Sequence, residues 1–354
     1  MRKDAYWYCS KCGFRENIWK KYYWKCPLCG NPLDLDYQIE FDTSGRGILR
    51  YEGMLPFKPE KTRGEGSTPL VIEKSNSATI LFKLEYLNPS GSFKDRGTSL
   101  AIYYAYKMGF KEVVEDTSGN TGISVTLYSK VYGLKPLIVM PRTAPYGKKL
   151  IIKKLGGTIV EARDRTEASQ IVTKMVHDRF YVAHTWSYFY IIGSSTIAYE
   201  VFEEYGIPDY VIAPIGSGGL FLGLFYGFKK LVELGLTDKF PKFIGVQGYS
   251  VHPVYKALAG HSVEGDSSLA DGIMVSNPPR LNELVSVIRE SGGIVELVGN
   301  KEIIEALREL YELGFIVEPT SAVVWAVFRR LREKIQNKVV LLPLTGSGLK
   351  ITSE

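Results

Sequence analysis

From residue 78 onward the chain repeats one order of elements: a short apolar run, a loop of small residues, and a helical stretch. This alternation is typical of an α/β protein with largely parallel strands, because each helix carries the chain back to where the next strand begins. A length of 354 residues is large for one core, so we predict two lobes with open, mostly parallel twisted sheets. The predicted strands are 78–84, 112–115, 136–140, 158–161, 210–213, 243–247 and 338–342.

All four cysteines lie near the start of the chain, as two Cys-x-x-Cys pairs separated by 13 residues. A glycine follows each pair and permits the left-handed turn after the second ligand. Four thiolates at this spacing are typical of a closed, tetrahedral zinc site that is structural and not catalytic. Two disulfides are the alternative, but nothing in the sequence indicates an oxidising compartment. The predicted zinc ligands are Cys9, Cys12, Cys26 and Cys29.

A basic and aromatic stretch, residues 19–25, lies between the two cysteine pairs. Such a mixture can bind single-stranded nucleic acid through stacking and charge. A module of roughly 30 residues has almost no core of its own, however, so its aromatic side chains are better explained by packing on a neighbouring lobe or a second subunit. The net charge of +6 is mild for this length and equally compatible with an anionic substrate. We therefore expect no nucleic-acid partner.

The composition is that of a soluble globular protein, with 45% hydrophobic and 23% charged residues. No apolar run approaches the length needed to span a membrane. Residues 1–7 lack the apolar core and the small-residue cleavage site of a signal peptide. We therefore expect a cytoplasmic protein with no membrane partner.

Lys94 stands in an unusual turn, within the run NPSGSFKDRG at 88–97. Asn-Pro and Ser-Gly are turn formers, Ser92 can cap a helix, and residues 98–106 read as helical. The amine is therefore expected on a tight loop at the positive end of a helix. That environment favours the neutral, nucleophilic form of the amine, whereas a solvated surface lysine stays charged.

Three loops of small residues follow predicted strands, where ligands collect in α/β proteins. The first, residues 116–122, offers backbone N–H groups and the hydroxyls of Ser118 and Thr121 to an anion such as a carboxylate. The second, residues 214–220, opens a helix and can hold a phosphate, but it matches no nucleotide-binding motif. The third, residues 343–350, ends the last strand. Any one glycine loop is weak evidence, whereas three together with Lys94 predict a ligand site.

The motifs now assembled resemble those of the pyridoxal-phosphate enzymes of the tryptophan-synthase β-subunit class, also called fold type II. Within that class the chain is most similar to threonine synthases, some of which also carry a zinc-knuckle N-terminus. The resemblance runs in family order over nearly the whole chain. Its motifs are GEGSTPL (64–70), NPSGSFKDRG (88–97), SGNT (118–121), GSGG (216–219), EPTSA (318–322) and TGSGLK (345–350).

The resemblance implies a role for each candidate residue. Lys94 would bind pyridoxal phosphate as an imine, Asn120 would hydrogen-bond its phenolic oxygen, and Thr345 would face its ring nitrogen. Ser118 and Thr121 would clamp the carboxylate of the amino-acid substrate, while Ser90, Arg142 and Lys148 are candidates for the substrate phosphate. The cofactor phosphate would be held by Gly216, Ser217, Gly218, Gly219 and Leu220.

The same resemblance implies a domain organisation. We expect a zinc-ribbon-like module (1–40), a connector (41–65), a large cofactor-binding domain (66–97 and 191–354) and a small mobile domain (98–190). A homodimer is the family expectation. His184 is the one histidine that we expect near the cleft, because it follows the strand-like run 180–183.

The implied reaction converts O-phospho-L-homoserine and water into L-threonine and phosphate. Lys94 would remove the α-proton and then a β-proton, phosphate would leave from Cγ, and water would add at Cβ. The loop 115–123 is also similar to that of cysteine synthases, so a sulfhydrylase acting on O-phosphoserine or O-acetylserine is the main alternative. A threonine or serine dehydratase is another. The non-enzyme alternative is a zinc-containing binding protein with an inactive fold of this type.

Overall fold

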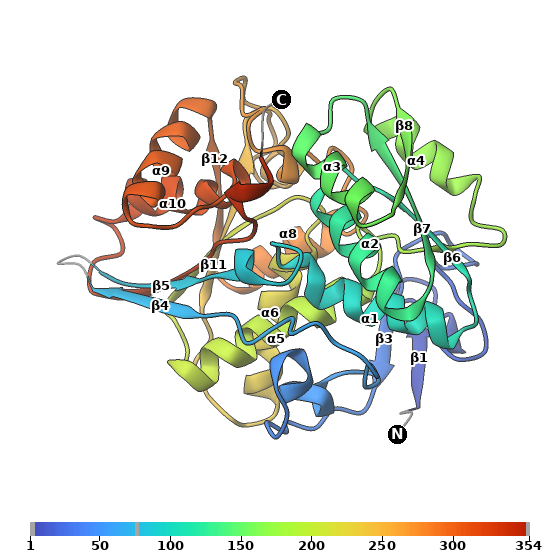
Figure 1. The fold of residues 1–354 in the computed structure, drawn as a ribbon. Coiled ribbons are helices and arrows are strands. Elements are labelled where there is room, and N and C mark those ends of the chain that lie inside the picture. Colours follow the sequence, from blue (N-terminus) through green and yellow to red (C-terminus); the bar gives the residue numbers. More distant parts are fainter. Residues whose placement is uncertain (1–3, 75–77, 352–354) are drawn as a thin grey trace. The chain divides into compact units, whose positions relative to one another are not determined.

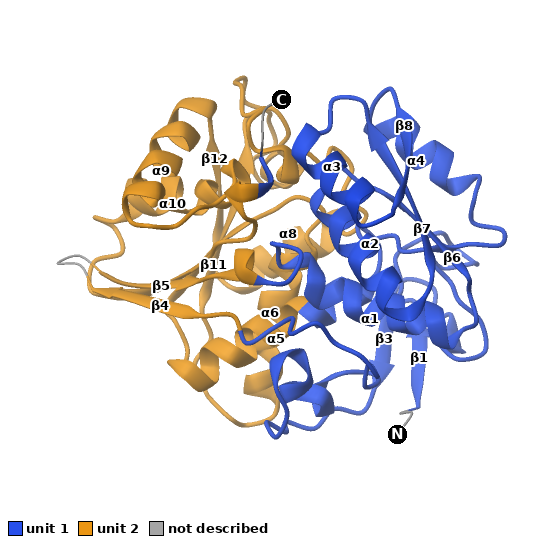
Figure 2. Cartoon of the chain, in the orientation of Figure 1, with its two compact units in different colours: residues 1–67, 88–193, 350–354 blue, residues 68–87, 194–349 orange. Residues whose placement is uncertain are grey.

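The computed structural model describes residues 4–74 and 78–351. The chain divides into two compact units (Figure 2). Unit 1 comprises residues 1–67, 88–193 and 350–354, and unit 2 comprises residues 68–87 and 194–349. No helix in the described part of the chain is long and apolar enough to cross a membrane.

Unit 2 is built on a six-stranded sheet with the order β12-β11-β10-β13-β5-β4. Every neighbouring pair is parallel except β4 and β5, so the antiparallel strand stands at the edge. The central strands are apolar and buried on both faces, as expected of a sheet covered by helices. The strands are β4 (Leu70–Lys74), β5 (Ala78–Lys83), β10 (Tyr210–Pro214), β11 (Lys242–Gly248), β12 (Ile294–Val298) and β13 (Lys338–Pro343).

Helices connect these parallel strands, and α9 packs against α10 (Figure 1). The amphipathic pattern of α8 and α9 places Leu284, Ile288, Ile303 and Leu310 in the core. The helices of unit 2 are α6 (Gly219–Glu233), α7 (Pro253–Ala259), α8 (Leu281–Glu290), α9 (Asn300–Glu312) and α10 (Pro319–Leu331), together with the latter part of α5 (Tyr188–Glu204). Short 3-10 turns are η2 (Glu85–Leu87), η3 (Asp271–Ile273) and η4 (Gly348–Lys350).

Unit 1 contains a parallel four-stranded sheet with the order β8-β7-β6-β9. Its strands are β6 (Glu112–Asp116), β7 (Lys135–Pro141), β8 (Thr158–Ala162) and β9 (Phe180–Tyr181). Its helices are α1 (Lys94–Lys107), α2 (Asn120–Tyr132), α3 (Tyr146–Lys154) and α4 (Arg165–Thr173), and η1 (Gly47–Met54) lies in the segment before them. The side chain of Asp164 caps α4 by accepting a hydrogen bond from the Glu167 N–H.

The N-terminal residues of unit 1 form a small antiparallel sheet with the order β2-β1-β3. Its strands are β1 (Ala5–Tyr8), β2 (Arg15–Asn17) and β3 (Asp34–Tyr37). Trp7 and Ile18 share one core cluster with Leu100 and Tyr104 of α1, and the Tyr104 hydroxyl donates to the Ile18 carbonyl. The cysteine-bearing segment therefore packs on the rest of unit 1 and shares its core.

The predicted α/β architecture with parallel sheets is confirmed, and each predicted strand is present within one or two residues of its expected ends. The structure adds β1, β2, β3, β4 and β12, which were not predicted, and β9 lies within the strand-like run 180–183. It also corrects one local prediction: α1 is preceded by Phe93 without a side-chain cap. The Ser92 hydroxyl is fully buried and has no hydrogen-bond partner among the described residues, so Ser92 does not cap the helix.

Candidate active site

Lys94 is the first residue of α1 and follows a tight turn. The Gly91 N–H donates to the Asn88 carbonyl at 2.7 Å, and Gly91 has a φ of +77°, which glycine adopts without strain. The Lys94 ammonium lies 4.7 Å from the centroid of the Phe93 ring and 5.8 Å from that of Tyr190. The amine is thus half-buried at a helix start, against two aromatic faces.

The turn that carries Lys94 is held by the next residue, Asp95. This fully buried carboxylate accepts a hydrogen bond from the Ser90 N–H at 2.6 Å and another from the Ser124 hydroxyl at 2.5 Å. Burial raises the pKa of Asp95 to about 6 despite these bonds. The predicted substrate residue Ser90 therefore lies in the same hydrogen-bonded turn as Lys94.

The loop before α2 brings Ser118, Asn120 and Thr121 into unit 1 with Lys94. Asn120 is the first residue of α2, and Thr121 is buried. Gly119 has a φ of +154°, and a Cβ at this position would overlap the side chain of Lys148. Lys148 is itself 2% exposed, so a buried cationic side chain crosses the backbone of the predicted anion loop. Only glycine fits there.

A second buried lysine, Lys350, links two parts of this site. Its ammonium donates to the Gly91 carbonyl at 2.6 Å and to Oδ1 of Asn120 at 2.8 Å. The sequence analysis included Lys350 in a motif but assigned it no role. The Lys350 side chain thus connects the turn that carries Lys94 to the start of α2 within unit 1.

A histidine and a glutamate form a buried pair in the same unit. Nδ1 of His184 contacts Oε1 of Glu115, and Oε2 of Glu115 is buried without a hydrogen-bond partner among the described residues. Burial raises the pKa of Glu115 well above its usual range. Burial, followed by the positive charge of Lys94, lowers the pKa of His184 well below its usual range. The His184 ring also packs edge-on against the ring of Tyr190, at 6.0 Å between centroids.

The segment that presents His184 is strained. Ala183 has a φ of +52°, in the left-handed region that a non-glycine residue rarely occupies. Its carbonyl accepts hydrogen bonds from the N–H groups of Trp186 and Ser187, which closes a turn around His184. The expectation that His184 lies near the cleft stays a prediction, and Glu115 was missed because it lies within an otherwise ordinary strand.

In unit 2, the predicted phosphate loop joins β10 to α6. Gly218 has a φ of +99°, and a Cβ on Gly216 would lie 2.8 Å from the Gly272 carbonyl. Ser217 and Leu220 are buried, and Gly219 is the first residue of α6. A loop of this shape at a helix N-terminus has the backbone geometry for binding a phosphate group.

Thr345 follows β13, the strand next to β10 in the sheet. Parallel neighbours end on the same side, so Thr345 and the loop after β10 lie at one edge of unit 2. The Thr345 hydroxyl lies 3.1 Å from the Ser321 hydroxyl, which in turn accepts the Gly346 N–H at 2.8 Å. Ser321, on α10, thereby holds the residue predicted to face the ring nitrogen.

The four cysteines come together as predicted. Their sulfur atoms all lie within 4.8 Å of one another, with 3.5 Å between Cys9 and Cys29 and between Cys12 and Cys26. The backbone N–H groups of Phe14 and Asn31 are directed at the sulfurs of Cys12 and Cys29. Tetrahedral zinc with bonds of about 2.3 Å requires sulfur atoms at comparable separations, so the donor set fits zinc.

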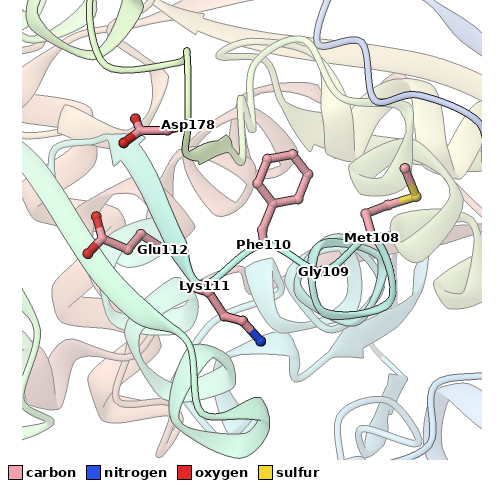
Figure 3. A pocket seen from close by; sticks show the side chains of 6 residues that line it. All are labelled: Met108, Gly109, Phe110, Lys111, Glu112 and Asp178. Atoms are coloured by element: carbon pink, nitrogen blue, oxygen red, sulfur yellow. The ribbon is translucent and has the colours of Figure 1, made fainter.

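A shallow hollow of about 440 Å³ lies just after the C-terminal end of α1, and Figure 3 shows the residues that line it. It is lined by Met108, Gly109, Phe110, Lys111, Glu112 and Asp178. Because α1 has 14 residues and rises about 1.5 Å for each, this hollow is roughly 20 Å along the helix from Lys94. It is therefore not part of the predicted site.

Known proteins resemble this chain over most of its length. The sequence profile of the family described as "Pyridoxal-phosphate dependent enzyme" matches residues 61–346. A threonine synthase of Methanocaldococcus jannaschii is 29% identical to this chain, and the alignment covers 97% of this chain and 92% of that protein. A threonine synthase of Methanosarcina acetivorans is 28% identical, and the alignment covers 91% of this chain and 86% of that protein.

Solved structures show the same fold. An O-acetylserine dependent cystathionine beta-synthase from Helicobacter pylori superposes with a TM-score of 0.70 at 23% identity, over 82% of this chain and 95% of its own. A serine racemase from Dictyostelium discoideum superposes with a TM-score of 0.65 at 26% identity, over 79% and 92%.

Proposed function

Because this chain belongs to the family of pyridoxal-phosphate dependent enzymes, we propose that it is a threonine synthase, which converts O-phospho-L-homoserine and water into L-threonine and phosphate. One observation carries the proposal: Lys94, Asn120 and the loop with Ser118 and Thr121 lie in one unit at the starts of α1 and α2. The names of the similar threonine synthases support the choice of this activity.

Bound pyridoxal phosphate would supply an electron sink for the α-carbon of an amino acid. The residues proposed to hold it are Lys94 at its carbonyl carbon, Asn120 at its phenolic oxygen, residues 216–220 at its phosphate and Thr345 at its ring nitrogen. Thr345 offers a neutral hydroxyl, held by Ser321. A neutral partner does not enforce protonation of the ring nitrogen as a carboxylate would, which favours elimination and replacement over transamination.

Lys94 is proposed to move the protons. With substrate bound, the Lys94 amine would take up the α-proton and then a β-proton, and would return protons to Cγ and to Cα. The cofactor would supply the electron sink that lets phosphate leave from Cγ and water add at Cβ. The position of Lys94 at the start of α1, half-buried beside Phe93 and Tyr190, supports this use because it places the amine in the turn that also carries Ser90.

The remaining residues are proposed to orient the substrate. The hydroxyls of Ser118 and Thr121, together with N–H groups at the start of α2, would bind the α-carboxylate. Buried Lys148, which crosses Gly119, and the turn at Ser90 are candidates for the substrate phosphate. We further propose that zinc at the four cysteines is structural, and that the protein is a cytoplasmic homodimer.

A sulfhydrylase that makes cysteine from O-phosphoserine or O-acetylserine is the second candidate. The observation in its favour is the loop Thr117-Ser118-Gly119-Asn120-Thr121, whose sequence is similar to that of cysteine synthases. A dehydratase would release ammonia and a 2-oxo acid from threonine or serine. A binding protein without catalysis would turn over none of these substrates.

One assay separates these candidates. The purified, cofactor-loaded protein is given O-phospho-L-homoserine, and released phosphate and threonine are measured together. In parallel it is given O-phosphoserine or O-acetylserine with sulfide, and threonine or serine alone. Equal formation of phosphate and threonine, at the highest turnover of the set, supports the proposal. Faster sulfide-dependent cysteine formation, or faster ammonia release, would overturn it.

A further inference from the structure

Lys350 ends the TGSGLK motif and is 5% exposed, although a lysine is rarely buried without a specific partner. It belongs to unit 1 together with Lys94 and Asn120. The segment 345–350 therefore contains Thr345, which belongs to unit 2, and Lys350, which belongs to unit 1. The proposed function uses Thr345 but leaves Lys350 unexplained.

The two contacts of Lys350 determine the orientation of the Asn120 amide. A lysine ammonium has three N–H donors and no acceptor. Its partner on Asn120, at 2.8 Å, must therefore be the carbonyl oxygen Oδ1. The amide nitrogen Nδ2 is then directed away from Lys350, and its N–H groups are presented as donors. The second contact, at 2.6 Å from Nζ to the Gly91 carbonyl, fixes Lys350 to the turn that carries Lys94.

A positive charge on the oxygen side of an amide also strengthens its N–H groups as donors. Hydrogen bonds in a chain polarise one another, and the effect is larger in a buried site with a low dielectric. An ammonium bonded to Oδ1 draws electron density from the amide nitrogen. The donor strength of Asn120 toward an acceptor beyond Nδ2 therefore depends on Lys350.

We propose that Lys350 is a positioning residue for the cofactor: it holds the Asn120 amide so that Nδ2 donates to the phenolic oxygen of pyridoxal phosphate bound at Lys94. This inference rests on the proposed function, which places the cofactor at Lys94 and Asn120. A donor at the phenolic oxygen stabilises its ionised form, in which the imine nitrogen carries the proton. A weaker donor favours the neutral phenol.

The two forms absorb at different wavelengths, the ionised phenol in the visible and the neutral phenol in the near ultraviolet. The ratio of the near-ultraviolet band to the visible band in the substrate-free protein therefore reports on the donor. In Lys350→Met this ratio is expected to rise roughly two- to tenfold, the factor that corresponds to one hydrogen bond of ordinary net strength. Activity need not be measured.

Lys149→Met is the matched control. Lys149 also lies in unit 1 and also donates to a backbone carbonyl, that of Arg142 at 2.9 Å. Its ammonium also pairs with Glu161, and among the described residues Lys149 has no contact with Asn120. Its removal should leave the absorption ratio unchanged.

A double-mutant cycle separates positioning from a purely structural effect. Asn120→Ala alone should raise the ratio, and Lys350→Met should raise it no further in the Asn120→Ala background. If Lys350→Met leaves the ratio unchanged in the wild-type background, or shifts it equally in both backgrounds, the inference is wrong. If Lys350→Met does not fold, Lys350→Gln, which keeps N–H donors without the charge, should give an intermediate ratio, and an unchanged ratio would overturn the inference.

The outcomes also distinguish this inference from the proposed function. An unchanged spectrum in Asn120→Ala contradicts the placement of the cofactor itself, and both proposals fail together. A shifted spectrum in Asn120→Ala with an unshifted Lys350→Met contradicts only the role of Lys350.

Discussion

The Tyr22 hydroxyl donates a hydrogen bond to the backbone carbonyl of Tyr181. Tyr22 lies between the two cysteine pairs, and Tyr181 ends β9, three residues before His184. Trp24 packs beside it, with ring centroids 5.4 Å from Tyr181 and 5.3 Å from Trp186. The segment between the cysteine pairs therefore holds the chain on both sides of His184.

Loss of zinc should therefore destabilise the chain on both sides of His184 as well as the cysteine-bearing segment. In Cys26→Ser we expect loss of bound zinc and a lower melting temperature for unit 1, because the donor set that fixes residues 9–29 is incomplete. Metal analysis and thermal unfolding measure both. Tyr22→Phe is the milder companion: it keeps the cysteines and the zinc but removes one buried hydrogen bond, at a cost of about 1–2 kcal/mol. Unchanged zinc content and melting in Cys26→Ser would contradict a structural zinc site.

Stability should depend on pH through Asp95. Its pKa is about 6 in the folded protein, against 3.8 for an ordinary carboxyl. Between these values the folded protein binds more protons than the unfolded chain, so the free energy of unfolding falls as pH rises through this window. The total fall is about 3 kcal/mol, and the contribution is constant above the folded pKa.

Asp95→Asn removes this titrating carboxyl. The free energy of unfolding of the wild type minus that of Asp95→Asn, measured by urea denaturation at several pH values from 4 to 7, should therefore fall as pH rises. A difference that is independent of pH would show that Asp95 does not titrate in this range. Comparing the two proteins cancels the titration of the other groups.

Gly119→Ala should damage the substrate site. The new Cβ would meet the side chain of buried Lys148, and the backbone conformation suits only glycine. Since displacements of about 1 Å at a catalytic site can cost roughly 100-fold in rate, we expect a loss of that order in kcat/KM for the amino-acid substrate.

Gly133→Ala is the control at the other end of α2. Gly133 also has a positive φ, +69°, but no atom lies within 4 Å of a Cβ built there. It should cost about 1 kcal/mol of stability from backbone strain and leave kcat/KM unchanged. Equal losses of activity in the two variants would contradict a specific role for Gly119.

Replacing the carboxyl of Glu115 by an amide should preserve its hydrogen bond to His184. Because burial raises the pKa of Glu115 well above its usual range, the carboxyl is expected to keep its proton and to donate to Nδ1 of a neutral His184. Glu115→Gln preserves such a donor and should alter stability by less than about 1 kcal/mol. Glu115→Ala leaves a cavity and an unpartnered imidazole, at roughly 2–4 kcal/mol. A Gln variant as unstable as the Ala variant, in the same urea titration, would mean that Glu115 is ionised.

The sequence predicted those local features that a few neighbouring residues determine. The strand ends, the turn before Lys94 and the loops before α2 and α6 follow from apolar runs, turn formers and glycines over a few residues. The edge strand β4 was missed because it is short and mostly exposed, with the burial of its residues decided only by pairing to β5.

Contacts between distant segments were not predictable in the same way. Lys350 meets Asn120 across 230 positions, Tyr22 meets Tyr181 across 159, and Glu115 meets His184 across 69. A lone lysine, tyrosine or glutamate carries no periodic signal that names its partner. The expected division into large and small domains also concerns packing between distant segments and stays a prediction.

The most direct test of the account is to locate the cofactor chemically. Pyridoxal phosphate bound to the purified protein is fixed with borohydride, and the modified residue is identified by proteolysis and mass spectrometry. We predict a single adduct on Lys94, and loss of both the adduct and the visible absorption band in folded Lys94→Ala. An adduct on another lysine, Lys350 included, or no adduct on a folded protein given excess cofactor, would contradict the central claim.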